Sequence, residues 1–149
     1  MFMSLLNCHC PDERGRVAFL LGANSFTSWV WGWEEFPVAK NIAKMYVDNG
    51  ATCLSVLTEE KHFLGKLDYI RDIKNKFKIP VLAKDFFIDP YQIALSKSYG
   101  SDCILIIIAA LDAKLADEIY AEAKRHNLSV IVEVHDNKEA ETALKYEDA

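Results

Sequence analysis

The chain has 149 residues, of which 51% are hydrophobic, enough for one domain with a sizeable core. Its formal net charge of −5 argues against a nucleic-acid-binding surface and against a polybasic membrane surface. The longest uncharged stretch, residues 17–33, holds too many glycine and polar residues for a membrane-spanning helix, and acidic residues precede it where a secretory signal would be basic. We therefore expect a cytoplasmic protein with no nucleic-acid or membrane partner.

The first 36 residues follow no regular pattern. Residues 8–10, Cys-His-Cys, are the only metal-like cluster, but structural zinc sites take about four ligands and no second pair matches. Residues 17–21 favour a strand, whereas Trp29, Trp31 and Trp33 alternate without a matching helix. We expect no metal and no cofactor. Residues 1–36 are an atypical segment, for which one interpretation is a weakly specified apolar lead-in and the other, which we favour, is a replaced or misread first unit.

From residue 37 onward, helix and strand patterns alternate. Residues 37–49 carry apolar side chains at helical spacing, and Gly50 can supply a left-handed cap. The remaining patterns predict strands at 52–57, 81–84, 103–108 and 129–134. They also predict a helix at 67–77, one that begins at 89–90 and ends before Gly100, and two that begin at Asp112 and Asp136. The run at 103–108 has no polar alternation, as expected for a strand covered on both faces.

Aspartates predict where the later helices begin. Asp89 can accept a hydrogen bond from the first turn while Pro90 takes the first helical position. Asp112 stands in the same place before the next helix, and Asp136 with Glu139 resembles a capping box.

The strands recur about every 25 residues, which predicts parallel strands joined by right-handed helical crossovers. No glycine-rich turn follows a strand, so a dinucleotide-binding sheet is disfavoured. Such a period suits either an open doubly wound α/β sheet or an α/β TIM barrel. A TIM barrel here would be incomplete, because about four to five units are present and a closed barrel has about eight. We assign residues 37–149 to this one domain, which is a partial barrel in the second interpretation.

Two apolar strands end in an ionisable residue. Lys84 ends the strand at 81–84, and Glu133 lies near the end of the strand at 129–134. In barrels of parallel strands chemistry takes place at this end, so both are candidate catalytic residues. The alternative is structural: the lysine could extend to solvent, or the two could form an ion pair.

Several segments carry a resemblance to one enzyme family. They are LSVLTEEKHF at 54–63, PVLAKDF at 80–86, IDPYQI at 88–93, ILIIIAALD at 104–112 and VEVHD at 132–136. Together with IAKMY at 42–46, they make residues 42–149 similar to indole-3-glycerol-phosphate synthase, a TIM barrel of tryptophan biosynthesis. The match corresponds to the second to fifth units of that barrel.

The resemblance implies an activity and a set of roles. The family closes the indole ring of 1-(2-carboxyphenylamino)-1-deoxyribulose 5-phosphate with loss of carbon dioxide and water, so the implied partner is a small phosphorylated substrate. Lys84 resembles the family's general acid and Glu133 its general base. Phe63, Phe86 and Leu105 resemble the residues that line the pocket for the anthranilate ring.

Other charged residues near these positions have plainer interpretations. We expect Asp85 to point away from Lys84 and to form an ion pair, and we interpret residues 59–61 as a solvated loop. His135 is interpreted as a loop residue and not as an acid or base.

The resemblance also has gaps. The family's Glu-x-Lys-x-x-Ser-Pro-Ser pattern has no counterpart in residues 1–36, and its Asn-Asn-Arg strand would begin after residue 149. We therefore expect a fragment or a degenerate gene product that is weak or inactive alone. The alternative is a non-catalytic half-barrel that self-associates through open sheet edges near Thr52 and Val130, of which residues 17–33 could cover one. Another phosphate-sugar barrel, such as phosphoribosylanthranilate isomerase, is disfavoured by the Lys-Asp-Phe and Glu-Val-His segments.

Overall fold

The computed structural model describes residues 17–20 and 38–146. Within these residues one parallel sheet runs in the order β1-β2-β3-β4-β5, so strands that follow one another along the chain are neighbours. The strands are β1 (Val17–Leu20), β2 (Cys53–Leu57), β3 (Val81–Lys84), β4 (Cys103–Ile107) and β5 (Ser129–Glu133). The cluster at residues 8–10 and the three tryptophans lie outside the described residues.

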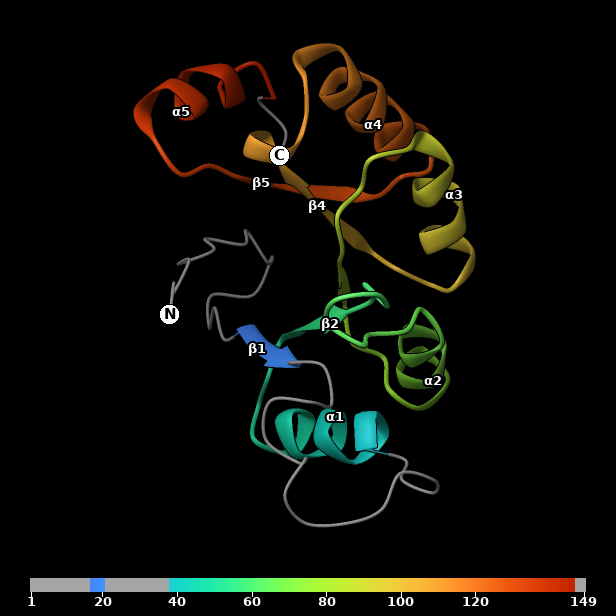
Figure 1. Ribbon diagram of the computed structural model, residues 1–149. Helices are drawn as coiled ribbons and strands as arrows, with labels where there is room; N and C mark the ends of the chain where they lie inside the picture. The colour runs from blue at the N-terminus through green and yellow to red at the C-terminus, as the bar shows by residue number, and fades with distance from the viewer. Residues whose placement is uncertain (1–16, 21–37, 147–149) are drawn as a thin grey trace.

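Each strand is followed by a helix. The helices are α1 (Val38–Asp48), α2 (Asp68–Lys76), α3 (Pro90–Ser98), α4 (Ala113–Arg125) and α5 (Asn137–Ala143). They follow one another in an arc around the outside of the sheet (Figure 1). Together the parallel strands and the outer helices confirm the predicted partial TIM barrel. No helix in the described part of the chain is long and apolar enough to cross a membrane.

The strands alternate between two faces, as their period of two requires. Val81 and Ala83 of β3 join the core that packs on the helices, whereas Leu82 lies in a second cluster with Leu105 of β4. Lys84 lies two residues beyond Leu82 and therefore belongs to the second face. This second face is the inner face of the partial barrel. The larger hydrophobic core lies on the outer face, between the sheet and the helices.

The predicted helix starts agree with the structure. Asp89 and Gln92 form a full capping box at α3, and the Asp112 carboxylate accepts a hydrogen bond from the Leu115 amide at α4. At α5 the Asp136 carboxylate accepts from the Glu139 amide, as predicted. The Glu139 side chain, however, accepts from the amide of His135, one residue before the capping residue, and not from that of Asp136. Strand β4 ends at Ile107, because a 3-10 turn, η1 (Ile108–Ala110), begins there.

One predicted sheet edge is wrong. Strand β1 pairs in parallel with β2, with Val17 opposite Cys53, so the strand that follows Thr52 is internal. The four residues of β1 are too short a run to fix a pairing from sequence, which is why the edge was misassigned. Strand β5 is the last strand at the other end of the described sheet.

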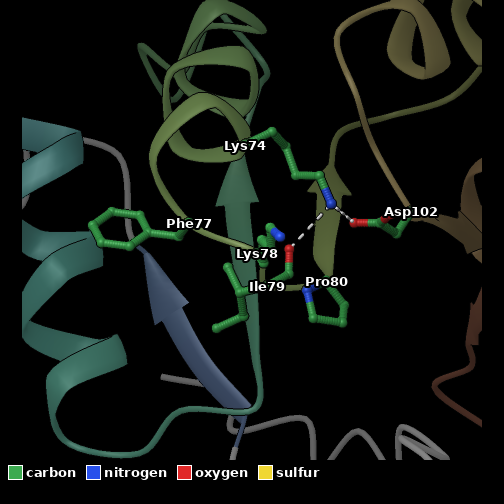
Figure 2. A pocket seen from close by; sticks show the side chains of 6 residues that line it. All are labelled: Lys74, Phe77, Lys78, Ile79, Pro80 and Asp102. Carbon is green, nitrogen blue, oxygen red and sulfur yellow. Dashed lines mark hydrogen bonds and ion pairs between the residues drawn. The ribbon is translucent and has the colours of Figure 1, made fainter.

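An ion pair joins two units at the amino-terminal ends of the strands. Lys74 of α2 lies 2.8 Å from the carboxylate of Asp102, which precedes β4, and also donates to the Ile79 carbonyl (Figure 2). The same Asp102 oxygen accepts from the Val81 amide at 2.8 Å. These residues border a cavity of about 300 Å³, lined by Lys74, Phe77, Lys78, Ile79, Pro80 and Asp102.

Candidate functional site

Lys84 and Glu133 meet at the opposite, carboxyl-terminal end of the sheet. They belong to β3 and β5, which flank β4, and both project from the inner face. Lys84 Nζ lies 3.8 Å from Glu133 Oε2, with side-chain exposures of 39% and 18%. At this distance the two groups form an ion pair, but they are too far apart for a hydrogen bond. The two groups predicted to act as acid and base are therefore neighbours that no hydrogen bond joins.

His135 contacts the other oxygen of Glu133. Its Nε2 lies 3.2 Å from Glu133 Oε1, and its Nδ1 lies 3.3 Å from Glu139 Oε2. The interpretation of His135 as an uninvolved loop residue missed this arrangement. Two sequence signals could have found it, because residues 133 and 135 share a face of extended chain and residues 135 and 139 span one helical turn.

The two predicted pocket aromatics lie side by side. The ring centroids of Phe63 and Phe86 are 6.3 Å apart with an interplanar angle of 36°, within the range of favourable aromatic pairs. Both remain substantially exposed, whereas Leu105 is buried among Leu82 and Ile131 on the inner face. The two rings form an open apolar surface, and Leu105 belongs to the packed interior of that face.

The loop between β2 and α2 holds Phe63 in place. The Glu59 carboxylate accepts hydrogen bonds from the amides of Lys61, His62 and Phe63. Desolvation alone would raise the pKa of Glu59, but the three N–H donors outweigh it and hold the pKa below its ordinary value. Glu59 therefore organises the loop, which the interpretation as a solvated loop did not predict.

Gly65 closes the same loop tightly. Its amide donates to the Glu59 carbonyl at 2.7 Å, and a Cβ built on it would lie 2.3 Å from the Leu57 carbonyl oxygen. A side chain at this position would push the loop off the end of β2. The close approach of the two backbone segments explains why glycine occurs here.

Asp85 has a different partner from the one predicted. Its Oδ2 accepts from the Thr58 hydroxyl at 2.6 Å, and its Oδ1 accepts from the Phe86 amide. The expected ion pair is wrong, since within residues 38–146 no cation pairs with Asp85. Burial raises the pKa of Asp85 despite these two donors, and the nearby carboxylates of Glu59 and Glu60 add to the rise.

No cluster of three or more metal-ligating side chains is found in the described part of the chain. A second cavity, of about 490 Å³, lies between η1, α4 and α5 and includes Asp112, Asp136 and Glu139. Neither this cavity nor the one near Lys74 is lined by any of the five predicted site residues.

The model of one protein family, indole-3-glycerol phosphate synthase, matches residues 34–149, well over half of the chain. The chain belongs to this family. The family match confirms the resemblance inferred from the segments that surround Lys84 and Glu133.

Solved structures of other barrel enzymes share the fold. KGPDC from Streptococcus mutans matches with a TM-score of 0.61 and 13% identity over 75% of this chain and 57% of its own. A 3-hexulose-6-phosphate synthase matches with a TM-score of 0.60 and 16% identity, over 74% of this chain and 54% of its own. Monomers of the dimeric phosphoribosylanthranilate isomerase from Thermotoga maritima match with a TM-score of 0.59 and 18% identity, over 88% of this chain and 59% of their own. The chain thus spans slightly more than half the length of these structures, and at such identities the likeness shows the fold alone.

Proposed function

We propose that this chain carries the acid and base of an indole-3-glycerol phosphate synthase site, acting on 1-(2-carboxyphenylamino)-1-deoxyribulose 5-phosphate. The observation that carries the proposal is the approach of Lys84 and Glu133 to 3.8 Å on the inner face, at the end of the strands where barrel enzymes do their chemistry. Family membership supplies the reaction, and the geometry supplies a pair of groups able to perform it.

The reaction needs a proton delivered and a proton removed. Ring closure forms a bond between the aromatic carbon and the substrate carbonyl carbon, and the Lys84 ammonium gives the carbonyl oxygen its proton. Carbon dioxide then leaves from the same ring carbon, and the electrons of that bond restore the benzene ring. Loss of water makes the new five-membered ring aromatic: Glu133 takes a proton from the adjacent carbon, and the hydroxyl group leaves as water with a proton from Lys84, which solvent has re-protonated. Because the two groups are not hydrogen-bonded to each other, substrate atoms can come between them without first breaking a strong contact.

The aromatic pair supports the substrate class. Phe63 and Phe86 present exposed ring surface at the end of β2 and β3, and an anthranilate ring can pack on such a surface. Leu105 is buried in the inner face on β4, the strand between those that carry Lys84 and Glu133. The mouth therefore combines an apolar surface with two charged groups, the mixture typical of small-molecule sites.

The substrate phosphate limits the rate that we expect from these 149 residues. In TIM barrels the phosphate commonly binds in the loops after the seventh and eighth strands, and the described sheet has five. Binding energy from a remote phosphate normally positions the reacting atoms, and a misplacement of about 1 Å can cost roughly a hundredfold. We expect slow turnover, measurable only with stoichiometric protein.

The test is formation of the indole chromophore by the purified chain under single-turnover conditions. We expect slow product formation that is lost in Lys84→Met and in Glu133→Gln. The matched control is Lys74→Met, which removes a lysine from the other end of the strands and should retain the rate. Product formation that survives Lys84→Met would overturn the assignment of Lys84.

A non-catalytic half-barrel that self-associates is the second candidate. It is favoured by β5, which pairs with β4 on one side and with no other described strand. Unpaired backbone groups on such a strand favour pairing with another chain. Light scattering that shows a mass rising with concentration would support this candidate, and a monomer at all concentrations would contradict it.

A further inference from the structure

The environment of Glu133 differs at its two oxygens. Oε2 faces Lys84 on the inner face of the sheet, whereas Oε1 faces the imidazole of His135 in the loop before α5. Glu133 is mostly buried, with 18% of its side chain exposed, but His135 is 50% exposed. The imidazole therefore lies between a sheltered carboxylate and solvent.

Glu139 determines which ring nitrogen of His135 can exchange a proton. Glu139 Oε2 accepts from the His135 backbone amide at 2.7 Å, and Nδ1 of the same residue lies 3.3 Å from that oxygen. Glu139 is itself held at the start of α5, because its amide donates to the Asp136 carboxylate. A carboxylate can only accept, so a hydrogen bond at this position needs its proton on Nδ1, whereas Nε2 lies near Glu133 Oε1 as an ion-pair contact without hydrogen-bond geometry.

These contacts decide which ring nitrogen of His135 faces Glu133. With Nδ1 protonated, Nε2 has a lone pair when the ring is neutral and a proton when the ring is charged. Nε2 is the atom that lies 3.2 Å from Glu133 Oε1. A histidine fixed by one carboxylate so that its other nitrogen faces a reacting group is the arrangement that catalytic triads use.

We propose that His135 is a positioning residue for Glu133, oriented by Glu139 so that Nε2 takes the proton that Glu133 has removed from the substrate. The inference rests on the proposed function. The proton leaves the substrate carbon for Glu133, passes from Oε1 to Nε2 to give an imidazolium, and goes from there to solvent. Glu133 is then again a carboxylate and His135 is again neutral, while Lys84 regains from solvent the proton that it delivered to the substrate oxygen.

The orientation of His135 is measured without any activity. Nitrogen-15 spectra of the ring nitrogens are recorded on the 149-residue chain at a pH where imidazoles are neutral, and His135→Gln identifies the signal by its loss. We expect the Nδ1–H form for His135, and a shift toward the ordinary Nε2–H form in Glu139→Ala. An Nε2–H form in the unmodified chain, or no change in Glu139→Ala, would overturn the proposal.

The chain offers a matched control. His126 Nε2 lies 3.0 Å from Glu122 Oε1, one helical turn away on α4 and far from the sheet end. Glu122→Ala should change the signal of His126 and leave that of His135 as it was. A change at His135 in this variant would show a general loss of structure and would remove the support that Glu139→Ala provides.

A kinetic measurement separates this inference from the proposed function. In single turnover, His135→Ala should slow the chemical step by roughly ten- to hundredfold, the range for partners that orient a functional ligand, and leave substrate affinity unchanged. Added imidazole should restore much of the rate, which a purely structural role would not allow. No turnover in the unmodified chain would count against the proposed function, whereas an unrescued variant beside an active parent would count against the relay.

Discussion

The same sheet holds a lysine–carboxylate pair at each end, and the two pairs are built differently. At the amino-terminal ends of the strands, Lys74 and Asp102 are 2.8 Å apart (Figure 2). At the carboxyl-terminal ends, Lys84 and Glu133 are 3.8 Å apart. Both lysines are partly exposed, so exposure does not explain the difference. What differs is the number of additional hydrogen bonds that each pair makes.

The tight pair is fixed by backbone partners. Asp102 also accepts from the Val81 amide, and Lys74 also donates to the Ile79 carbonyl. The loose pair has no such backbone partners among the described residues: Lys84 Nζ contacts Glu133, and the other Glu133 oxygen faces the ring nitrogen of a histidine. The comparison teaches that the first pair is tied to backbone groups that connect α2, β3 and β4, whereas the second is held, within the described residues, by side-chain contacts alone.

The largest expected effect is on turnover. Lys84→Met should lower single-turnover product formation by about a hundredfold or more, the usual contribution of a general acid, with little change in unfolding temperature. Lys74→Met should do the reverse, lowering the unfolding temperature and sparing the rate. Thermal unfolding and the indole assay on both variants check this, and two variants with the same profile would break the comparison.

The second effect is on stability. Asp102→Ala should lower the free energy of unfolding by about 2 kcal/mol, chiefly because the buried Val81 amide loses its acceptor. The ion pair itself contributes little, since both side chains are partly exposed. Asp102→Asn retains an acceptor and should cost less than half as much in urea unfolding. Equal losses for both substitutions would mean that the charge, not the amide bond, holds this end together.

The third effect concerns the aromatic surface beside the loose pair. Phe86→Ala should weaken binding of an N-substituted anthranilate about fivefold, because a favourable aromatic contact contributes roughly 1 kcal/mol. Fluorescence of the anthranilate measures the affinity. Tyr91→Ala is the control, since Tyr91 is a more exposed ring on α3 that belongs to neither the aromatic pair nor the charged pair. Equal weakening by Tyr91→Ala would remove the special role of the Phe63–Phe86 pair.

The smallest effect is a pH dependence at Asp85. Its folded-state pKa is raised above the ordinary 3.8, so ionised Asp85 destabilises the fold at neutral pH. That cost falls as the pH drops through the folded pKa and is gone below the unfolded value. Asp85→Asn should therefore stabilise the chain by on the order of 0.5 kcal/mol near neutral pH and by nothing in acid. Urea unfolding at both pH values measures it, and a gain that persists in acid would contradict the assignment to ionisation.

Sequence patterns predicted the helix starts because caps are local. Asp89 and Asp112 act on amides two or three residues away, and the residues that decide this are adjacent in the chain. The second to fifth strands were predicted for a similar reason, since each is a short apolar run between helices. The pairing of β1 was not predictable in this way, because four residues give too weak a pattern to identify a partner.

The site was predicted only as far as single residues. Lys84 and Glu133 stand at strand ends, which the pattern shows, but their partners come from separate segments. The expected ion pair of Asp85 was wrong because the Thr58 hydroxyl, at the end of the neighbouring strand β2, donates to Asp85 instead. His135 lies in the loop before α5, as interpreted, but its contacts with two carboxylates at once were not predictable, because only the turn into α5 brings Glu139 beside it.

The tight backbone approach at Gly65 has a consequence for ligand binding. Because Glu59 accepts from three successive amides and Gly65 closes the loop against Leu57, the backbone that carries Phe63 is held by hydrogen bonds within the loop itself. Binding of a planar ligand to the ring of Phe63 should therefore cost the loop little additional backbone entropy. Replacing Gly65 with alanine would displace the loop from the end of β2, so that a ligand packing on Phe63 would first have to reorder the loop. Calorimetry would show this as a larger entropic penalty on binding.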